Sequence, residues 1–310
     1  MIDMRDAFFN RLYDYVSKDK NVLVLTADHG AFGLKKIEKD FPEQYLNVGI
    51  AEQTLISLAA GLASCGKKVY VYAINNFVSL RVLEQVNVDI CAMNLDVNII
   101  GVGAGFTYST DGPTHHGVQD VAAMINLPRL HVYNATDDIN TKKLVDLSYL
   151  NKHPKYFRIE KGLLPRLYSE EDDINLGVKQ LETTTSDTIV FSSGFMTHTT
   201  QNVINTIKQN GIDVSHCDLF CLNPLPEQNI LNLCENKRVI VVEENIKSGG
   251  IGQKLFSLLK ENGHKKDVLN ISLDNDFYFS FGDRNLLHKV THLDESSINQ
   301  KITDFIKKAV

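Results

Sequence analysis

Short runs of β-branched and aromatic residues alternate with longer amphipathic segments along most of the chain. The short runs have the length and composition of strands, and the segments between them repeat with a helical period. This alternation predicts an α/β fold in which parallel strands are joined by crossover helices. In the first half the strand candidates are residues 21–27, 68–73, 97–102, 130–134 and 155–159, and the helix candidates are 51–64, 77–94, 117–126 and 138–151.

The alternation lapses between residues 159 and 173, where a proline and an acidic run replace the periodic pattern. Such a stretch is typical of a connection that runs over the surface between two domains. A second series of strand and helix candidates follows it, and 310 residues are enough for two hydrophobic cores. We therefore expect two domains, residues 1–165 and 175–310, each a mostly parallel sheet with helices on both faces.

Charge and hydropathy argue against a nucleic-acid-binding, membrane-bound or secreted protein. The chain has 32 basic and 38 acidic residues, a formal charge of −6, and both signs are scattered. This pattern argues against a nucleic-acid or anionic-membrane partner. No apolar run is long enough to span a bilayer, and the first twenty residues mix acids and bases, unlike a signal peptide, so we expect a cytoplasmic protein.

Five cysteines, an odd number at unrelated spacings, argue against a disulfide framework. The one close set is His216, Cys217 and Cys221. The segment around them has a strand pattern, which places His216 on the opposite face from both thiols. Buried strand cysteines are therefore favoured over a metal site, and no metal ligands are predicted.

Ligands of open parallel sheets bind at the carboxyl ends of strands, so the segments that follow strands are the candidate sites. The first is "TADHG", where Asp28 and His29 follow a strand. A cap on the next helix by Asp28 is the favoured interpretation of this segment.

The second segment is "NVGIAEQ", in which Glu52 lies in the first turn of a helix made of small and apolar residues. An isolated glutamate there complements the helix dipole. Gly49 and Ala51, however, leave room for a flat ligand, and burial in such a place raises the pKa of a carboxyl group. A raised pKa suits a group that exchanges protons.

The third and fourth segments carry aromatic and imidazole groups. Phe77 stands at a strand-to-helix turn, where it either joins the core or stacks on a heteroaromatic ring. The segment "IIGVGAGFTYSTDGPTHHGVQD" has the spacing GxGxG, which excludes the GxGxxG dinucleotide fingerprint. His115 and His116 in it are either substrate-handling groups or part of a solvated turn before a helix.

Taken in order and spacing, "NVGIAEQ", an "NFxxxRxxEQ" stretch, "DGPTHH" and "VVEEN" followed by "GGIG" resemble the transketolase family of thiamine diphosphate enzymes. The resemblance runs from about residue 20 to the end. It implies a pyrimidine-binding domain followed by the transketolase carboxyl-terminal domain, the part that forms a separate beta subunit in split members. The last of these motifs either makes an anion site at a helix amino terminus or, as we favour, a tight strand-to-helix turn at a subunit contact.

The resemblance assigns roles to particular residues. Glu52 matches the glutamate that hydrogen-bonds the cofactor's aminopyrimidine and favours its imino tautomer, which then takes the proton of the thiazolium carbon. Phe77 matches the aromatic that stacks on the pyrimidine, with Ile50 and Asn76 as neighbouring cofactor contacts. The expected substrate and proton-transfer groups are His29, Asp111, His115 and His116.

Two positions depart from transketolases that act on sugar phosphates. Asn134 stands where they have an arginine, and Gly103 stands where they have a histidine. Because asparagine cannot replace the charge of a bidentate arginine, the usual phosphorylated ketose is not the expected substrate.

The family's diphosphate-binding motif, GDG, does not occur in the sequence. We therefore expect a partner alpha subunit to hold the diphosphate through Mg²⁺, in an α₂β₂ assembly around a homodimer of this chain. The resemblance leaves two alternatives open. One is a decarboxylating enzyme similar to deoxyxylulose-phosphate synthase or a 2-oxoacid dehydrogenase beta subunit, and the other is a non-catalytic partner of the same fold.

Overall fold

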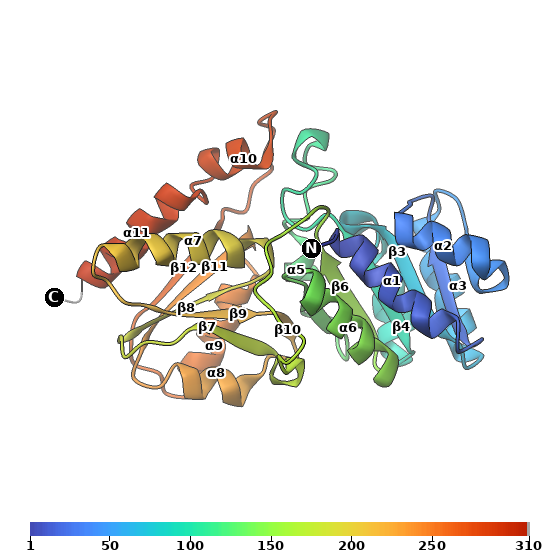
Figure 1. Cartoon of the computed structure of the whole chain (residues 1–310), viewed down its shortest axis with the longest axis horizontal. Coiled ribbons are helices and arrows are strands. Elements are labelled where there is room, and N and C mark those ends of the chain that lie inside the picture. Colours follow the sequence, from blue (N-terminus) through green and yellow to red (C-terminus); the bar gives the residue numbers. More distant parts are fainter. Residues whose placement is uncertain (309–310) are drawn as a thin grey trace. The chain divides into compact units, whose positions relative to one another are not determined.

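The computed structural model describes residues 1–308, which form two compact units (Figure 1). The first unit comprises Met1–Ala104 and Ala123–Asp172, and the second comprises Gly105–Ala122 and the chain from Asp173 onward. Each unit is a mostly parallel sheet covered by helices, so the predicted α/β fold is confirmed. The glycine-rich segment 105–122 packs with the second unit, although residues of the first unit flank it in the sequence.

The sheet of the first unit has the strand order β5-β6-β4-β3-β1-β2, and all five pairings are parallel. Its central strands β3 and β4 are almost wholly buried, as expected for a sheet covered on both faces. The strands are β1 (Val22–Thr26), β2 (Tyr45–Asn47), β3 (Lys68–Ile74), β4 (Val97–Val102), β5 (His131–Asn134) and β6 (Lys155–Ile159).

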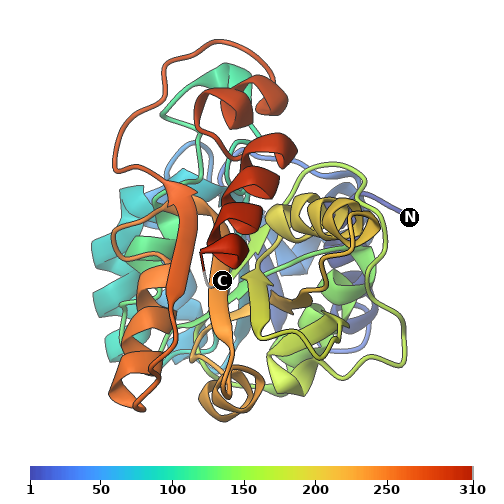
Figure 2. The same ribbon diagram turned by 90° about the vertical axis from the view of Figure 1, so that its left-hand side faces the viewer.

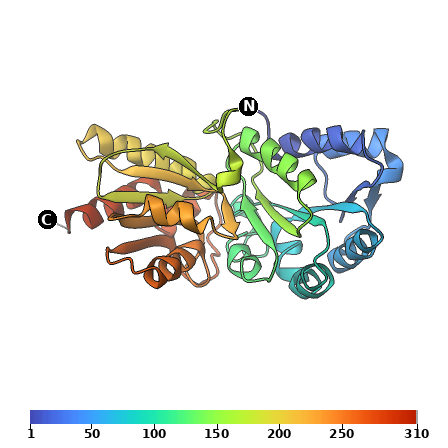
Figure 3. The ribbon, with the colours of Figure 1, turned by 90° about the horizontal axis from the view of Figure 1, so that it is seen from below.

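Helices cover both faces of this sheet, with α1 and α6 on one face and α3 on the other (Figure 3). Two of the helices start at aspartate caps: Asp3 accepts from the backbone N–H of Arg5, and Asp137 from those of Ile139 and Asn140. The helices are α1 (Met4–Val16), α2 (Phe32–Asp40), α3 (Glu52–Ser64), α4 (Leu83–Gln85) and α6 (Asp138–Leu150), while α5 (Asp120–Met124) spans the return of the chain from the second unit to the first.

The helix predicted over 77–94 is broken in the structure. A 3₁₀ turn at Leu80–Val82 leads into the single turn of α4, and a π-helix follows over Val86–Ala92. Valines at 78, 82, 86 and 88 lower the α-helical propensity of this stretch because β-branched side chains lose χ1 freedom in a helix. Amphipathic spacing alone did not reveal the break.

The sheet of the second unit has the order β12-β11-β8-β9-β7, with β7 antiparallel to β9 and the other pairings parallel. Helices α7 and α11 pack together on one side of it, while α8 and α9 lie on the other (Figure 1). Its strands are β7 (Val178–Glu182), β8 (Thr188–Ser192), β9 (Ser215–Leu219), β11 (Arg238–Ile246) and β12 (Val268–Leu273). The short strand β10 (Cys221–Asn223) also lies in the second unit but is not part of this sheet. The helices are α7 (Phe195–Gln209), α8 (Glu227–Leu233), α9 (Ile251–Glu261), α10 (Arg284–Val290) and α11 (Glu295–Lys307).

Cys217 and Cys221 are buried free thiols in β9 and β10, as the strand pattern predicted. Burial raises the pKa of each thiol to about 12. His216 on β9 contacts neither sulfur and instead hydrogen-bonds Ser192 Oγ at 2.7 Å and Gln201 Oε1 at 2.8 Å. Within residues 1–308, no helix is both long and apolar enough to cross a bilayer.

Candidate functional site

Glu52 is the first residue of α3 and is only 5% exposed. The preceding residue, Ala51, occupies the N-cap position without a side-chain cap, so the carboxylate of Glu52 is the acidic group of the first turn. Gly49, three residues earlier, has φ +75° with open space around it, so its backbone conformation is what favours glycine there. The local sequence thus delivers one carboxylate, shielded from water, to the positive end of a helix dipole.

Arg81 connects Glu52 to Phe77. Its Nη1 lies 2.8 Å from Glu52 Oε2, and its guanidinium carbon lies 3.8 Å from the centre of the Phe77 ring. The half-buried Phe77 ring stands at the carboxyl end of β3, in the turn before the broken helix. The structure therefore brings together two predicted cofactor residues and adds a third residue, Arg81, to which the sequence had assigned no role. The signal was present, because Arg81 is the arginine of the "NFxxxR" stretch.

The two other predicted cofactor residues differ in accessibility. Ile50 is 80% exposed, which is unusual for a large aliphatic side chain, and it immediately precedes the first turn of α3. Asn76 is buried beside Phe77 in the turn after β3. An exposed apolar side chain next to a buried carboxylate leaves a surface that a flat ligand can cover.

His29 lies in the loop after β1, with its ring 5.2 Å from that of Tyr72. Its Nε2 is buried and has no hydrogen-bond partner among the described residues. Burial, helped by the charges of Arg5 and Lys161, lowers the pKa of His29 to about 4, so the ring is neutral at pH 7. A neutral imidazole whose buried nitrogen has no hydrogen-bond partner in the described residues is suited to bind a polar ligand atom.

The predicted helix cap by Asp28 is wrong. The N-cap position of α2 is Ala31, and no side chain caps this helix. Asp28 instead has φ +49°, and its backbone N–H donates to Asn47 Oδ1 at 3.0 Å. The left-handed conformation, which aspartate tolerates better than most residues, turns the chain three residues before the N-cap position, too early for a cap.

Asp111, His115 and His116 lie in the segment 105–122 of the second unit. Asp111 is exposed and His115 is partly exposed, with its Nδ1 3.0 Å from Thr114 Oγ1. His116 is buried, and its Nε2 donates to the carbonyl oxygen of Ser109 at 3.2 Å. Burial lowers the pKa of His116 below its usual value. The two adjacent histidines therefore differ: His115 faces outward, whereas His116 braces the loop.

The helix amino terminus after "VVEEN" is already occupied by an anion from the chain itself. The carboxylate of Glu243 accepts hydrogen bonds from the backbone N–H groups of Ile251 at 2.8 Å and Gly252 at 2.9 Å, at the start of α9. The structure contains the strand-to-helix turn between β11 and α9, and the alternative interpretation as a ligand anion site is wrong, because Glu243 takes that position. That this turn lies at a subunit contact stays a prediction.

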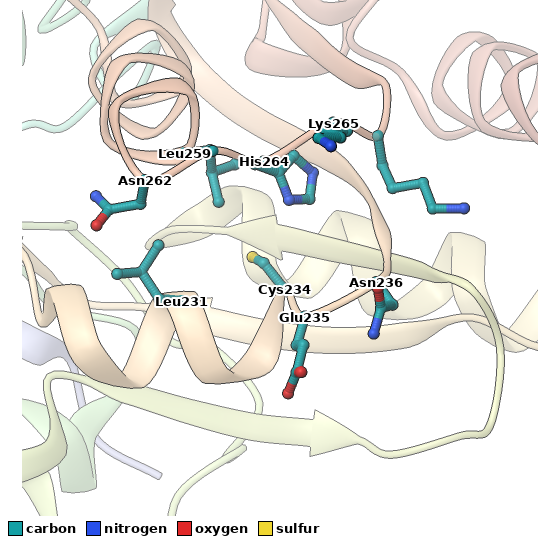
Figure 4. Close-up of a pocket in the computed structure, with 10 residues that line it drawn as sticks. Leu231, Cys234, Glu235, Asn236, Leu259, Asn262, His264 and Lys265 are labelled. Carbon is teal, nitrogen blue, oxygen red and sulfur yellow. The ribbon is translucent and has the colours of Figure 1, made fainter.

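A pocket of about 470 Å³ lies between the end of α8 and the end of α9 (Figure 4). Its lining comes from the loops that lead into β11 and β12, including Asn236, His264 and Lys265. These loops lie at the amino ends of parallel strands, the edge opposite to the one where such sheets bind ligands. We therefore do not assign the pocket to the candidate site.

Comparison with known proteins gives two family matches. Residues 1–166 match the model "Transketolase, pyrimidine binding domain", and residues 177–298 match "Transketolase, C-terminal domain". The chain belongs to the transketolase family. Its strands β1 to β6 and Glu52 fall within the pyrimidine-binding match, and β11 with Glu243 falls within the carboxyl-terminal match.

Curated members of the transketolase family align with nearly the whole chain. One of the subunits of apulose-4-phosphate transketolase from Phocaeicola vulgatus is 29% identical over 99% of this chain and 99% of its own length. A putative transketolase C-terminal section of Methanocaldococcus jannaschii is 29% identical over 98% of this chain and 96% of its own length. In contrast, 1-deoxy-D-xylulose-5-phosphate synthase of Halothermothrix orenii is 28% identical, and the match covers 46% of its length.

Solved structures show the same fold at lower identity. A structure described as "Split gene transketolase, inactive beta4 tetramer" has a TM-score of 0.89 and 24% identity, covering 98% of both chains. A transketolase from Pichia stipitis in complex with sedoheptulose 7-phosphate has a TM-score of 0.79 and 16% identity, over 98% of this chain and 45% of its own. These structures confirm the predicted fold, and the two family matches confirm the predicted family.

Enzymes of the transketolase family use thiamine diphosphate, and the first unit fits one end of that cofactor. A buried carboxylate, Glu52, is a hydrogen-bond partner for an aminopyrimidine, and Phe77 offers a flat ring beside it. Among residues 1–308, no three His, Cys, Asp or Glu side chains lie close enough to hold a metal ion. Glu52 and Phe77 are therefore the candidate residues for the pyrimidine end of the cofactor.

Proposed function

We propose that this chain is the beta subunit of a two-chain transketolase, a transferase that moves a ketol or acyl unit from a donor to an aldehyde or ketone acceptor. The observation that carries the proposal is the buried carboxylate of Glu52 at the start of α3, joined through Arg81 to the Phe77 ring. A non-catalytic scaffold has no need to bury a carboxylate beside a half-buried ring, because burying a charge costs free energy.

When bound, thiamine diphosphate supplies the thiazolium carbon that attacks the donor carbonyl. Glu52 would hydrogen-bond the aminopyrimidine ring and exchange a proton with it, and the burial of Glu52 keeps competing water away. Phe77 would pack on the face of that ring, with Ile50 and Asn76 beside it. Arg81, 2.8 Å from Glu52, keeps the carboxylate in one orientation.

For the substrate, we propose that His29 accepts or donates one hydrogen bond through its buried Nε2, and that Asp111 and His115 contact substrate hydroxyls. His116 takes part in this set mainly by supporting the loop through its bond to Ser109. Asn134 at the carboxyl end of β5 is only 3% exposed, and Gly103 has φ +100°, a conformation that disfavours a histidine there. Both features favour a substrate without a terminal phosphate at that position.

We further propose the assembly. The boundaries 1–165 and 175–310 define the pyrimidine-binding and carboxyl-terminal domains, and a partner alpha subunit contributes the diphosphate-binding domain with its Mg²⁺. Two beta chains form the homodimer core of an α₂β₂ heterotetramer. The Phocaeicola relative is named as one subunit of a transketolase, which supports the two-chain arrangement, and the tetrameric split-gene structure supports self-association.

The test is reconstitution. The chain is co-purified with a GDG-containing alpha chain from the same genome, and transfer of a two-carbon ketol unit from several ketoses to several aldehydes is followed in the presence of thiamine diphosphate and Mg²⁺. We expect transfer by the pair, none by either chain alone, and none by a pair carrying Phe77→Ala. Carbon dioxide release from pyruvate with no ketol transfer would assign the chain to the decarboxylating enzymes instead. Transfer undiminished by Phe77→Ala would contradict the proposed cofactor site.

A further inference from the structure

The segment that carries Asp111 and His115 is a closed loop. Gly105 and Gly117 exchange two backbone hydrogen bonds of 2.8 Å, so the eleven residues between them start and end at one antiparallel bridge. The tip is accessible, because Asp111 is exposed and His115 is partly exposed. In Figures 1 and 2 the tip lies beside α10 and the chain that leads into it, all within the second unit.

Glu244 at the end of β11 fills the space next to the bridge. A Cβ atom added to Gly105 would lie 1.7 Å from Glu244 Oε2, and Gly105 has φ +56°. Glycine is therefore required twice at this position, once by the backbone conformation and once by the carboxylate packed against it. Glu244 itself is only 4% exposed.

Two side chains of α10 fix the carboxylate of Glu244. Arg284 pairs with both carboxylate oxygens, with its Nε 3.0 Å from Oε1, and His288 Nε2 donates to Oε1 at 2.5 Å. Arg284 also lies over the Phe195 ring at 3.5 Å. Burial by itself raises the pKa of Glu244, but the charges and hydrogen bonds of Arg284 and His288 outweigh it and lower this pKa to about 2. The carboxylate is thus ionised and held from two directions.

Phe106, the residue after Gly105, anchors the loop in the core of the second unit. It is fully buried and makes edge contacts with His116 at 5.0 Å and Tyr278 at 5.6 Å, and its centre is 6.1 Å from that of His288. His288 therefore touches both the carboxylate under Gly105 and the ring of Phe106. A displacement of His288 would move the Phe106 ring and, through it, His116, which supports the tip of the loop.

The end of the same strand also holds the returning side of the loop. The backbone N–H of Ile246 donates to the carbonyl of Val118 at 2.9 Å, and Asn245 Nδ2 lies 3.3 Å from Asp120 Oδ1. Three consecutive residues at the end of β11 thus contact both ends of one loop. Nothing comparable is needed to close a surface turn that has no function.

We propose that Glu244, Arg284 and His288 of the carboxyl-terminal domain are positioning residues of the transfer reaction, which fix the base of the 105–117 loop and thereby place Asp111 and His115 for the substrate. The catalytic part of this inference rests on the proposed function, whereas the structural part does not. It gives the carboxyl-terminal domain a role in the reaction that does not involve contact with the cofactor.

The test measures loop mobility and catalysis on the same variants. Glu244→Gln removes the charge, and Arg284→Lys keeps a cation without the two-pronged contact. Gly105→Ala displaces the Glu244 carboxylate without changing any charged side chain. Glu182→Gln removes a surface carboxylate of the same unit, paired with Lys208. Gly263→Ala matches the backbone change, since Gly263 has φ +77° and no atom within 4 Å of its added Cβ. Hydrogen exchange of peptides covering 105–117 is recorded on the chain, and kcat and KM are measured on the α–β holoenzyme.

For Glu244→Gln and Gly105→Ala we expect amide exchange in 105–117 to rise by about tenfold or more and kcat/KM for the transfer to fall by roughly 10–100-fold, the cost of misplacing reactive groups by about an ångström. The dissociation constant for thiamine diphosphate in the holoenzyme should stay within about twofold of the original, because Glu52 and Phe77 are unchanged. Arg284→Lys should recover part of both losses relative to Arg284→Ala, and the two controls should match the original protein.

Unchanged exchange in 105–117 for both Glu244→Gln and Gly105→Ala overturns the proposal, and so does faster exchange with an unaltered kcat/KM. If Glu244→Gln does not fold, amide exchange in 105–117 and kcat/KM of Gly105→Ala and Arg284→Lys test the proposal by the same criteria. If the original holoenzyme shows no transfer at all, the proposed function fails, while the exchange data still decide whether the ion cluster holds the loop.

Discussion

The substitution Glu52→Gln separates a catalytic from a structural role for the buried carboxylate at the start of α3. Glutamine keeps the shape of the side chain but removes the charge. Two stabilising interactions are lost: the ion pair with Arg81, whose side chain is 43% exposed, and the attraction to the helix dipole. A pair with one partner so exposed contributes at most about 1 kcal/mol, and a first-turn carboxylate about 0.3–1 kcal/mol. We expect the free energy of unfolding to fall by about 1–2 kcal/mol.

Turnover should fall much further. Loss of a general acid–base group costs about 10²–10⁴ in rate, which corresponds to about 3–5 kcal/mol of activation free energy. A protein with the usual 5–15 kcal/mol of stability remains folded after losing 1–2 kcal/mol. Unfolding therefore cannot account for the expected loss of activity.

The assay compares thermal unfolding of the chain with ketol transfer by the reconstituted α–β pair. Glu295→Gln is the matched control, because Glu295 is the first-turn acid of α11, another helix of 13 residues, and hydrogen-bonds Asn202 at 2.9 Å. It should cost a similar amount of stability and leave turnover unchanged. Turnover by Glu52→Gln within threefold of the original would refute the assignment of Glu52 as the proton-exchanging group.

Three further outcomes are expected. Calorimetric titration of this chain without its partner should detect no tight binding of thiamine diphosphate and Mg²⁺, because Glu52 and Phe77 alone offer too little contact to offset immobilisation of the whole cofactor; stoichiometric binding by the single chain would contradict the split enzyme. The reconstituted enzyme should use xylulose 5-phosphate poorly and a donor without the terminal phosphate better, judged by kcat/KM; efficient use of pentose phosphates would assign the phosphate contact to another cation such as Arg158, Lys161 or Arg5. Burial lowers the pKa of His29 and His131 to about 4 and that of His216 to about 3, so the unfolded chain binds more protons than the folded one below about pH 6.5. The free energy of unfolding, measured by urea titration, should therefore stay constant above pH 7 and decline steadily from pH 6.5 towards pH 4. Equal stability at pH 7 and pH 5 would show that these rings are not buried as neutral groups.

Most strands could be predicted because their burial is continuous. Strands such as β4 and β8 are buried at every residue, and their apolar runs stand out against the amphipathic segments around them. The three-residue strands β2 and β10 and the edge strands β7 and β12 were missed. Two of the three residues of β2 are exposed, and most residues of β7 and β12 are only partly buried or exposed. Strands of this kind form because the adjacent strand offers backbone N–H and C=O groups for hydrogen bonding. Their own sequence carries little pattern from which a strand could be predicted.

Some residues of the candidate site could likewise be predicted from the sequence, and others could not. Glu52 and Phe77 could be predicted because each belongs to a short motif whose local structure is set by its own residues. Arg81 was in such a motif, but its role depends on how the broken helix after β3 turns it towards α3, and no residue pattern encodes that turn. Arg284 and His288 lie 40 and 44 residues from Glu244 along the chain, so their pairing with it is a property of the folded second unit alone.

The two glutamates of "VVEEN" let one strand, β11, support both the start of α9 and the base of the 105–117 loop. Neighbouring side chains on a strand point to opposite faces, so Glu243 and Glu244 cannot share a role. Glu243 turns to the start of α9, where Gly250 leaves space for its carboxylate and the backbone N–H groups of Ile251 and Gly252 donate to it. Glu244 turns the other way, towards Gly105 and towards Arg284 and His288 of α10. Exchanging either glutamate for glutamine therefore removes a different support, the helix cap in one case and the base of the loop in the other. Only the second change should reach the transfer reaction.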